Sequence, residues 1–269
     1  MGEMAEDRIY ADRRGKTDVY VGSELGLTLV AVSDDRVGRF RLIRRGGVQS
    51  VAASEETVVI GTDEDVYRAM TEEIESFEAL GFGPTVAVDA GGPIAASPDG
   101  EVARYDGPEW RSLGTVEDPE TITGEWIAAG DGLHRIEDET IERRGPAAHD
   151  VTADPVPTAA TVDGLYRFAD GEWERERRGV FHAITGDGRR SLAVGEEGLI
   201  ERRDGEWVKR EPPTDERIVD VGYGQGIVAV TSAGTILVDP PAAKDGAEGW
   251  RSRSLGLSDV TGLAVGPDR

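Results

Sequence analysis

Four side chains that could bind a metal ion or transfer protons recur at similar places in a repeated sequence pattern. They are His149, Asp150, His182 and Asp220, and each lies just before the apolar stretch that begins a repeat unit. Two imidazoles and two carboxylates could ligate a divalent cation, or serve as general acid and base. The alternative is structural, because polar groups in such positions also hydrogen-bond neighbouring backbone. The sequence leaves both interpretations open.

Two further polar residues belong to the same region of the repeat. In an alignment of the units, His182 is level with Asp150 and Asp220, whereas Gln49, Glu120 and His149 fall one residue earlier. We expect all six side chains to surround the mouth of a central channel. The candidate set at this mouth is therefore His149, Asp150, His182, Asp220, Glu120 and Gln49.

Other catalytic motifs are missing from the sequence. The chain has no cysteine, which excludes thiol catalysis, disulfides and zinc ribbons. No GxSxG nucleophile motif occurs, and Gly91-Gly92 is not followed by the Lys and Ser or Thr of a phosphate-binding loop. We therefore assign no catalytic residue and expect no cofactor.

The elements that must position these residues are short strands. A pair of small apolar residues closed by Gly, Ser or Thr recurs about every 35 residues, a spacing typical of β-propeller repeats. Its seven copies begin at Tyr20, Val59, Ala95, Ala128, Ala159, Ala193 and Val230.

Each copy leads into a turn and two more strands. Asp-Gly and related pairs mark the turns, because Gly readily adopts positive φ and Asp accepts local backbone hydrogen bonds. The next strand alternates apolar and charged residues, and the outer strand carries a tryptophan in several units, for which we predict a position between blades. These tryptophans are Trp110, Trp173, Trp207 and Trp250.

The repeat predicts an all-β chain folded as a seven-bladed β-propeller with four-stranded antiparallel blades, in one domain spanning residues 1–269. Six units run at about 47–81, 82–114, 115–145, 146–179, 180–214 and 215–257. Residues 18–46 contain the three outer strands of a blade, and residues 258–269 resemble an inner strand with nothing after it. We predict that these two ends form the first blade together, which closes the ring.

By its repeat and its composition, the whole chain resembles an uncharacterised β-propeller family of haloarchaea. The composition contains 53 Asp and Glu against 30 Lys and Arg, a formal charge of −23, and only three of the basic residues are Lys. Concentrated salt would screen the self-repulsion of such a chain. The resemblance implies a propeller fold and a halophilic protein, and no biochemical role.

Charge and hydropathy restrict the partners. An acidic chain is a poor ligand for nucleic acid, whose binding depends on cations that neutralise phosphates. No apolar run reaches the 18 residues of a membrane span, and the N-terminus lacks the apolar core of a signal peptide. We expect a cytoplasmic monomer that binds neither nucleic acid nor membrane.

Two functional hypotheses remain. The first is a non-catalytic binding or scaffold propeller that presents its top face to a protein partner. The second is a metal-binding or hydrolase-like propeller enzyme that uses the His149, Asp150, His182 and Asp220 sector. Fold class by itself does not decide between them.

Overall fold

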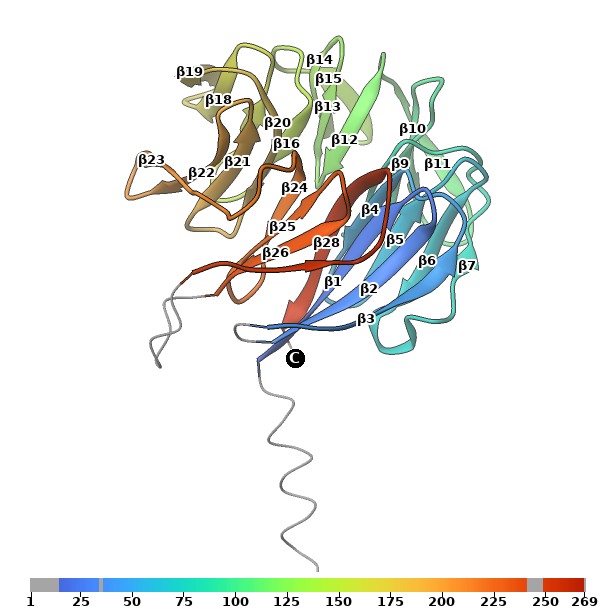
Figure 1. Ribbon diagram of the computed structural model, residues 1–269. Coiled ribbons are helices and arrows are strands. Elements are labelled where there is room, and N and C mark those ends of the chain that lie inside the picture. The colour runs from blue at the N-terminus through green and yellow to red at the C-terminus, as the bar shows by residue number, and fades with distance from the viewer. Residues whose placement is uncertain (1–14, 34–35, 241–248, 269) are drawn as a thin grey trace, which may run out of the picture.

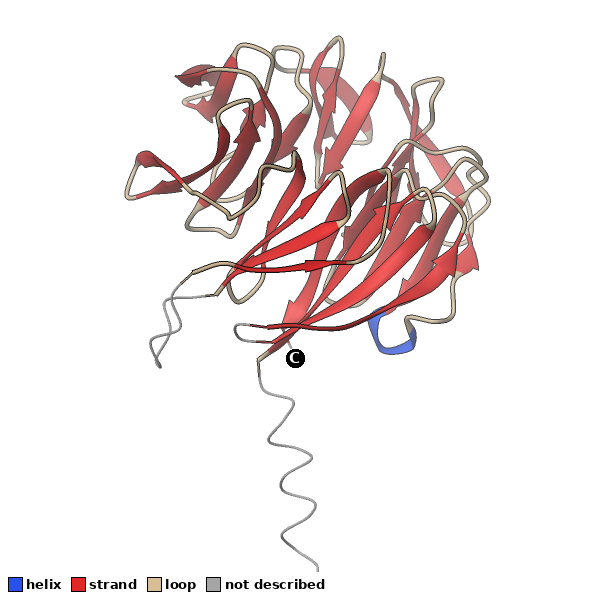
Figure 2. Ribbon diagram, viewed as in Figure 1, coloured by secondary structure: helices blue, strands red, loops and turns tan. Residues whose placement is uncertain are grey.

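The computed structural model describes residues 15–33, 36–240 and 249–268. These residues form seven four-stranded antiparallel sheets, which stand as blades around a central axis (Figure 1). Apart from a 3₁₀ turn at Thr71–Glu73, the described regular structure is entirely strand (Figure 2). The predicted seven-bladed propeller is confirmed, and no helix in the described part of the chain is long and apolar enough to cross a membrane.

Each blade contributes one strand to the axis and one to the rim. The inner strands are β4 (Ser50–Ala53), β8 (Ala87–Asp89), β12 (Pro119–Thr123), β16 (Asp150–Thr152), β20 (Phe181–Gly186), β24 (Ile218–Tyr223) and β28 (Val260–Asp268). The second strands are β1 (Lys16–Ser23), β5 (Thr57–Gly61), β9 (Ile94–Ala96), β13 (Trp126–Ala129), β17 (Thr158–Ala160), β21 (Ser191–Gly195) and β25 (Ile227–Thr231).

The outer half of each blade is built from two more strands. The third strands are β2 (Gly26–Ser33), β6 (Val66–Met70), β10 (Glu101–Tyr105), β14 (Gly132–Glu137), β18 (Gly164–Ala169), β22 (Gly198–Arg203) and β26 (Thr235–Asp239). The outermost strands are β3 (Arg36–Arg45), β7 (Glu78–Ala79), β11 (Trp110–Thr115), β15 (Thr140–Arg143), β19 (Glu172–Arg178), β23 (Glu206–Lys209) and β27 (Arg251–Ser254).

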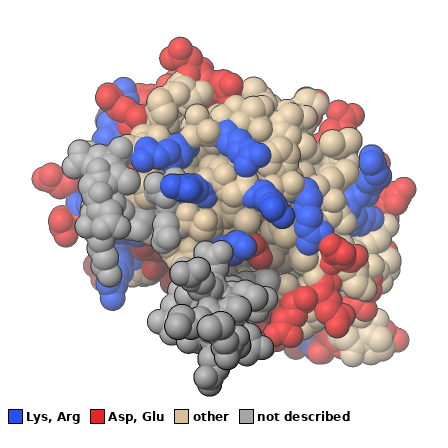
Figure 3. Space-filling view, turned by 60° about the horizontal axis from the view of Figure 1, so that its bottom comes forward, with Lys and Arg blue, Asp and Glu red and all other residues tan. Residues whose placement is uncertain are grey.

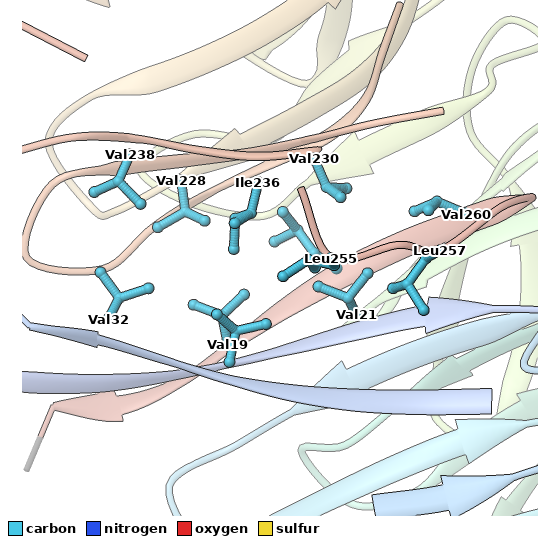
Figure 4. Packing of buried hydrophobic residues seen from close by; sticks show 12 residues of the cluster. Val19, Val21, Val32, Val228, Val230, Ile236, Val238, Leu255, Leu257 and Val260 are labelled. Atoms are coloured by element: carbon cyan, nitrogen blue, oxygen red, sulfur yellow. The ribbon is translucent and has the colours of Figure 1, made fainter. Parts of the chain in front are cut away.

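The core lies between blades. The second strands bury both faces because each is sandwiched by the neighbouring blades, which explains their continuous apolar sequence. Between the last blade and the first, Val19 and Val21 of β1 pack against Val228 and Val230 of β25 (Figure 4). Residues from the two ends of the chain therefore share one apolar cluster.

The C-terminal strand closes the ring. Strand β28 pairs antiparallel with β1, with Val265 opposite Val19 and Leu263 opposite Val21. The first blade therefore has the order β28-β1-β2-β3, and the predicted closure by the C-terminal segment is confirmed.

Tryptophans reach across blade boundaries, as predicted. The indole N–H of Trp110 donates to the carbonyl of Leu80 in the preceding blade at 2.9 Å. Trp173 meets Trp126 of the preceding blade edge to face, with ring centroids 5.3 Å apart. These contacts add a directional component to the apolar packing between blades.

Two Asp-Gly pairs form tight turns between a third strand and an outer strand. Asp170 and Gly171 have φ of 52° and 90°, and Asp204 and Gly205 have φ of 50° and 87°. Two successive positive φ values are typical of the type I′ turns that match the twist of a hairpin, and Asp tolerates the first of them. This chemistry explains why the dipeptide recurs with the repeat.

Candidate functional site

A central channel runs between the inner strands. Its cavity has a volume of about 440 Å³ and is lined by residues of all seven blades. The channel-lining polar side chains that the sequence singled out are Gln49, Glu120, Asp150, His182 and Asp220. We use "top face" for the end at which the outer strands connect to the next inner strands and the second strands turn into the third.

Strand register separates the candidates into two levels. Asp150 lies opposite Ala160 and Asp220 opposite Val230, so both are at the same depth in their blades. In blade six, however, Ala183 lies opposite Val194 at that depth, and His182 is an unpaired extra residue between Phe181 and Ala183. His182 thus lies one step nearer the mouth than the alignment of the units predicts.

The physical reason is a β-bulge. Extra residues interrupt the register of β12, β20 and β24, at Glu120, His182 and Val219 respectively. In two other blades, the residue at the same position donates its backbone N–H to a carbonyl of the second strand: His149 to Ala160 at 2.9 Å, and Gln49 to Gly61 at 2.8 Å. Glu120, His149, His182 and Gln49 therefore form the upper level, and the two aspartates the lower level.

Asp150 ties three blades together. Its Oδ2 accepts a hydrogen bond of 2.7 Å from the backbone N–H of Ile184 in the next blade. Its Oδ1 accepts the hydroxyl of Thr121 in the preceding blade at 2.9 Å and the N–H of Val151 at 2.8 Å. Both oxygens of the carboxylate therefore bind donors from the ring itself.

Asp220 repeats the arrangement two blade boundaries further along, between the seventh blade and the first. Its Oδ1 accepts the N–H of Val221 at 2.7 Å, and its Oδ2 accepts the N–H of Leu263 on the closing strand at 2.8 Å. Ser50 takes the same role with a hydroxyl, because Oγ accepts the N–H of Val88 at 3.2 Å. An acceptor on one inner strand that binds a backbone donor of the next is therefore a recurring inter-blade clamp.

The surroundings of the two carboxylates disfavour their charged forms. Burial in the ring, with the repulsion of Asp220, raises the pKa of Asp150 to about 7. Burial also raises the pKa of Asp220 to about 6, against the opposing effect of its two backbone donors. Both residues line the channel, so each carboxyl group can exchange its proton there near neutral pH.

The two histidines are engaged differently. His149 Nδ1 lies 2.9 Å from the carboxylate of Glu120 in the preceding blade. His182 Nε2 donates to the carbonyl of Ile218 at 3.0 Å. Partial burial lowers the pKa of His182 against the raising effect of its bond to Ile218, and repulsion by Arg217 lowers it further, so its imidazole is neutral at pH 7 with Nδ1 as an acceptor.

The sector is not a preassembled metal site. Within residues 15–33, 36–240 and 249–268, no group of three or more His, Asp or Glu side chains converges as metal ligands. The reason is geometric, because the bulge turns His182 toward Ile218 while Asp150 and Asp220 point at the backbone of the next blade. The four residues lie in one region of the ring, but their side chains do not point at a common position where a metal ion could bind.

A second cavity opens on the top face beside the channel. It has a volume of about 1080 Å³ and extends from the fourth blade to the seventh, and we call it the top groove. Its lining includes Glu120, His149, Val180, His182, Glu196 and Arg217. Arg217 was missed by the sequence analysis, because it lies in a connecting segment outside the repeated strands.

Together, the ring of seven sheets and the inter-blade clamps define the class of this molecule, which is a β-propeller. The chain belongs to a propeller family whose model, described as "Beta-prop_HVO_0234:-like, beta propeller", matches residues 3–266. Among curated proteins, none matches the sequence.

Three solved structures are similar in fold. The computationally designed Ika8 protein has a TM-score of 0.61 at 14% identity, over 93% of this chain and 90% of that one. The extracellular domain of the putative one component system BT4673 from B. thetaiotaomicron has a TM-score of 0.54 at 12% identity, over 89% and 39%. Hsv2 from Kluyvelomyces marxianus has a TM-score of 0.52 at 10% identity, over 72% and 76%. At these identities the similarity concerns the fold alone.

Proposed function

We propose that this chain is a non-catalytic binding or scaffold protein that takes a protein partner on its top face. The observation that carries the proposal is the top groove, whose polar lining is bordered by exposed apolar side chains. Val180 lines the groove and is 37% exposed. Val162, in the adjoining turn of the fifth blade, is 62% exposed.

These valines lie close together in the structure. The N–H of Phe181 donates to the carbonyl of Thr161 at 2.9 Å, so Val180 and Val162 flank the same backbone contact. Exposed apolar residues surrounded by polar ones are typical of protein-binding surfaces. The aspartates below the groove support the same proposal, because their oxygens already bind backbone donors.

The test compares partner capture by variants of two surfaces. Tagged parent, a Val162→Asp variant on the top face and a Val208→Asp variant on the outer strand β23 are used at native salt. Val208 is a matched control because it is also an exposed valine, at 50%. We expect the Val162 variant alone to lose the partner, and cross-linking to map that partner to the groove. A partner that both variants retain, or none captured by the folded parent, overturns the proposal.

The rival function is a metal-binding or hydrolase-like enzyme, and one observation favours it. Glu120, His149 and His182 all line the top groove, and His149 already lies 2.9 Å from Glu120. Metal analysis of protein purified in high salt separates the two functions. A stoichiometric divalent ion that is lost in His182→Ala would favour the metal-binding or enzymatic function. Equal amounts of the ion in parent and variant would count against it.

A further inference from the structure

Two adjacent outer strands from opposite ends of the sequence carry only positive charge. Strand β3 reads RVGRFRLIRR and strand β27 reads RSRS, with no Asp or Glu in either. Figure 3 shows Lys and Arg side chains gathered across the face that holds these strands, with Asp and Glu toward its edges. We call this surface the arginine face; its members are Arg36, Arg39, Arg41, Arg44, Arg45, Arg251 and Arg253.

The strands are in direct contact. Nη1 of Arg253 on β27 donates to the carbonyl of Val37 on β3 at 3.3 Å and also to that of Gly38 (Figure 1 shows the two strands side by side). The guanidinium of Arg253 also lies over the ring of Phe40, 4.9 Å from its centroid. Strands β3 and β27 therefore meet directly across the boundary between the last and first blades.

Three other outer strands of the propeller carry both signs of charge. Strand β19 reads EWERERR and alternates the two signs, and β15 and β23 each carry one acidic and one basic residue. Ion pairs accompany this mixing, such as Arg177 with Glu197 and Arg202 with Glu176. A single-sign surface is unexpected in a chain of charge −23, because like charges side by side destabilise a sheet.

Among the described residues, no carboxylate pairs with Arg39, Arg44, Arg45 or Arg253 of this face. Arg41 pairs with Glu75 of the neighbouring blade. Arg44 instead stacks on Tyr67 at 3.6 Å and donates to a carbonyl. Arg39 and Arg45 are exposed and form no ion pair with any residue in the described part of the chain. A carboxylate ligand would therefore find unsatisfied guanidinium groups.

We propose that the arginine face binds an acidic, extended polypeptide segment of a partner protein. Guanidinium groups hold carboxylates in bidentate pairs, which makes Arg suited to this recognition. Strand β3 is ten residues long and so presents its arginines over roughly 33 Å. That length suits a short acidic segment, and the surface is separate from the top groove.

The details favour polypeptide over single-stranded nucleic acid. Nucleic acid without sequence preference is bound by cationic grooves in which bases stack on exposed aromatic rings. Here the two rings on the face, Phe40 and Tyr67, are already covered by Arg253 and Arg44. A long polyphosphate would also extend beyond the two strands into a strongly acidic molecule.

The segment is recognised through side chains and does not extend the sheet. Strand β3 departs from regular register with β2 at two places, and Arg253 occupies carbonyls near one of them. Bulges and charged side chains of this kind prevent an outer strand from pairing with another chain. The arginines therefore protect the edge and also supply the binding groups.

The test is fluorescence anisotropy with three labelled probes, in the lowest salt at which circular dichroism shows the full-length parent folded. The first probe is a peptide of about twelve residues, roughly the span of β3, that alternates Glu or Asp with Val or Ala. The second is its Gln and Asn counterpart, and the third is an oligothymidylate of similar length. Parent protein is compared with an Arg39→Ser, Arg45→Ser double variant. The matched control, Arg175→Ser with Arg178→Ser on β19, removes the same charge elsewhere.

We expect the acidic peptide to bind the parent and the amide peptide not to bind. The Arg39, Arg45 double variant should weaken binding by about tenfold, and the β19 control by less than about twofold. Equal loss in both double variants would show a general charge effect and overturn the proposal. Tighter binding of the oligothymidylate than of the acidic peptide, or no binding of any probe to the folded parent, would overturn it also.

Discussion

At the scale of single residues, Asp150 and Asp220 act as acceptors that bridge neighbouring blades. Each carboxylate receives its own strand's N–H and an N–H of the next inner strand. Hydrogen bonds to charged acceptors are stronger than those between neutral groups, but here burial opposes the charge. The two aspartates therefore couple the integrity of the ring to proton binding.

This coupling predicts a pH-dependent stability. The folded pKa values of about 7 and about 6 lie above the ordinary aspartate pKa of 3.8, so the folded state holds more protons than the unfolded state between these limits. The free energy of unfolding should therefore fall as pH rises from about 4 to about 7. In Asp220→Asn, which cannot ionise, we expect the fall to be smaller by about 1–3 kcal/mol.

Urea unfolding at several pH values measures this difference within each protein, so a general loss of stability in the variant does not affect it. His182, whose pKa is lowered, contributes with the opposite sign in parent and variant alike. Parallel pH profiles for the two proteins would contradict the role assigned to Asp220.

Glu201 is a further buried carboxylate, and nothing in the sequence indicated its role. Its side chain is fully buried, 2.7 Å from Nε of Arg203 and 3.7 Å from nitrogens of Arg190 and Arg210. Replacing Glu201 by Leu would remove this carboxylate, although Arg190 keeps Asp187 and Arg210 keeps Asp239, and we expect a loss of about 1.5–3 kcal/mol in unfolding free energy. Denaturant midpoints measure it.

The matched control for this prediction is Glu139→Gln. Glu139 pairs with Arg111 at 2.6 Å, but it is 55% exposed, so its loss should cost no more than about 1 kcal/mol. Similar costs for the two substitutions would show that burial does not distinguish these carboxylates.

At the scale of elements, the closing strand has the largest structural consequence. Strand β28 supplies Val260 and Leu263 to the cluster between the last and first blades, and the N–H that Asp220 binds. Without it, β1 would expose an unpaired edge.

We therefore expect a chain ending at Leu257 to aggregate or to melt far below the parent. Burying an aliphatic side chain is worth about 1.5–3 kcal/mol, and several are lost from a total stability of about 5–15 kcal/mol. Thermal melts followed by circular dichroism compare it with a control ending at Pro267, which keeps the paired residues through Val265. A truncated chain that stays soluble and melts within a few degrees of the parent would contradict closure by β28.

At the scale of the whole molecule, charge sets the solution conditions for folding. A formal charge of −23 is weakly screened in dilute salt, where the Debye length reaches about 30 Å at 0.01 M. We expect the melting temperature to rise steeply with salt and most of the rise to occur below about 1 M, where screening becomes short-ranged.

A salt series by circular dichroism checks this expectation. Exclusion of salt from the protein surface would instead raise the melting temperature steadily at higher concentrations. A melting temperature that does not change between about 0.05 M and about 3 M would contradict a salt requirement for folding.

The sequence alone determined the seven-bladed ring and its closure. Both follow from local patterns: small apolar pairs such as Val59-Ile60, Asp-Gly turns such as Asp204-Gly205, and an unpaired inner-strand pattern at Val260–Val265. These patterns are visible because each blade is built from neighbouring residues, and periodicity reports which faces are buried.

The contacts between the polar residues depend on how the blades are arranged around the ring. The bulge at His182 shifts that residue by one place and changes its partner to Ile218, and no local pattern marked this shift. The arginine face arises because ring closure brings β27 beside β3, strands more than 200 residues apart in sequence. Hydrogen-bond partners and surface charge depend on distances across blade boundaries, which folding sets and local sequence does not encode.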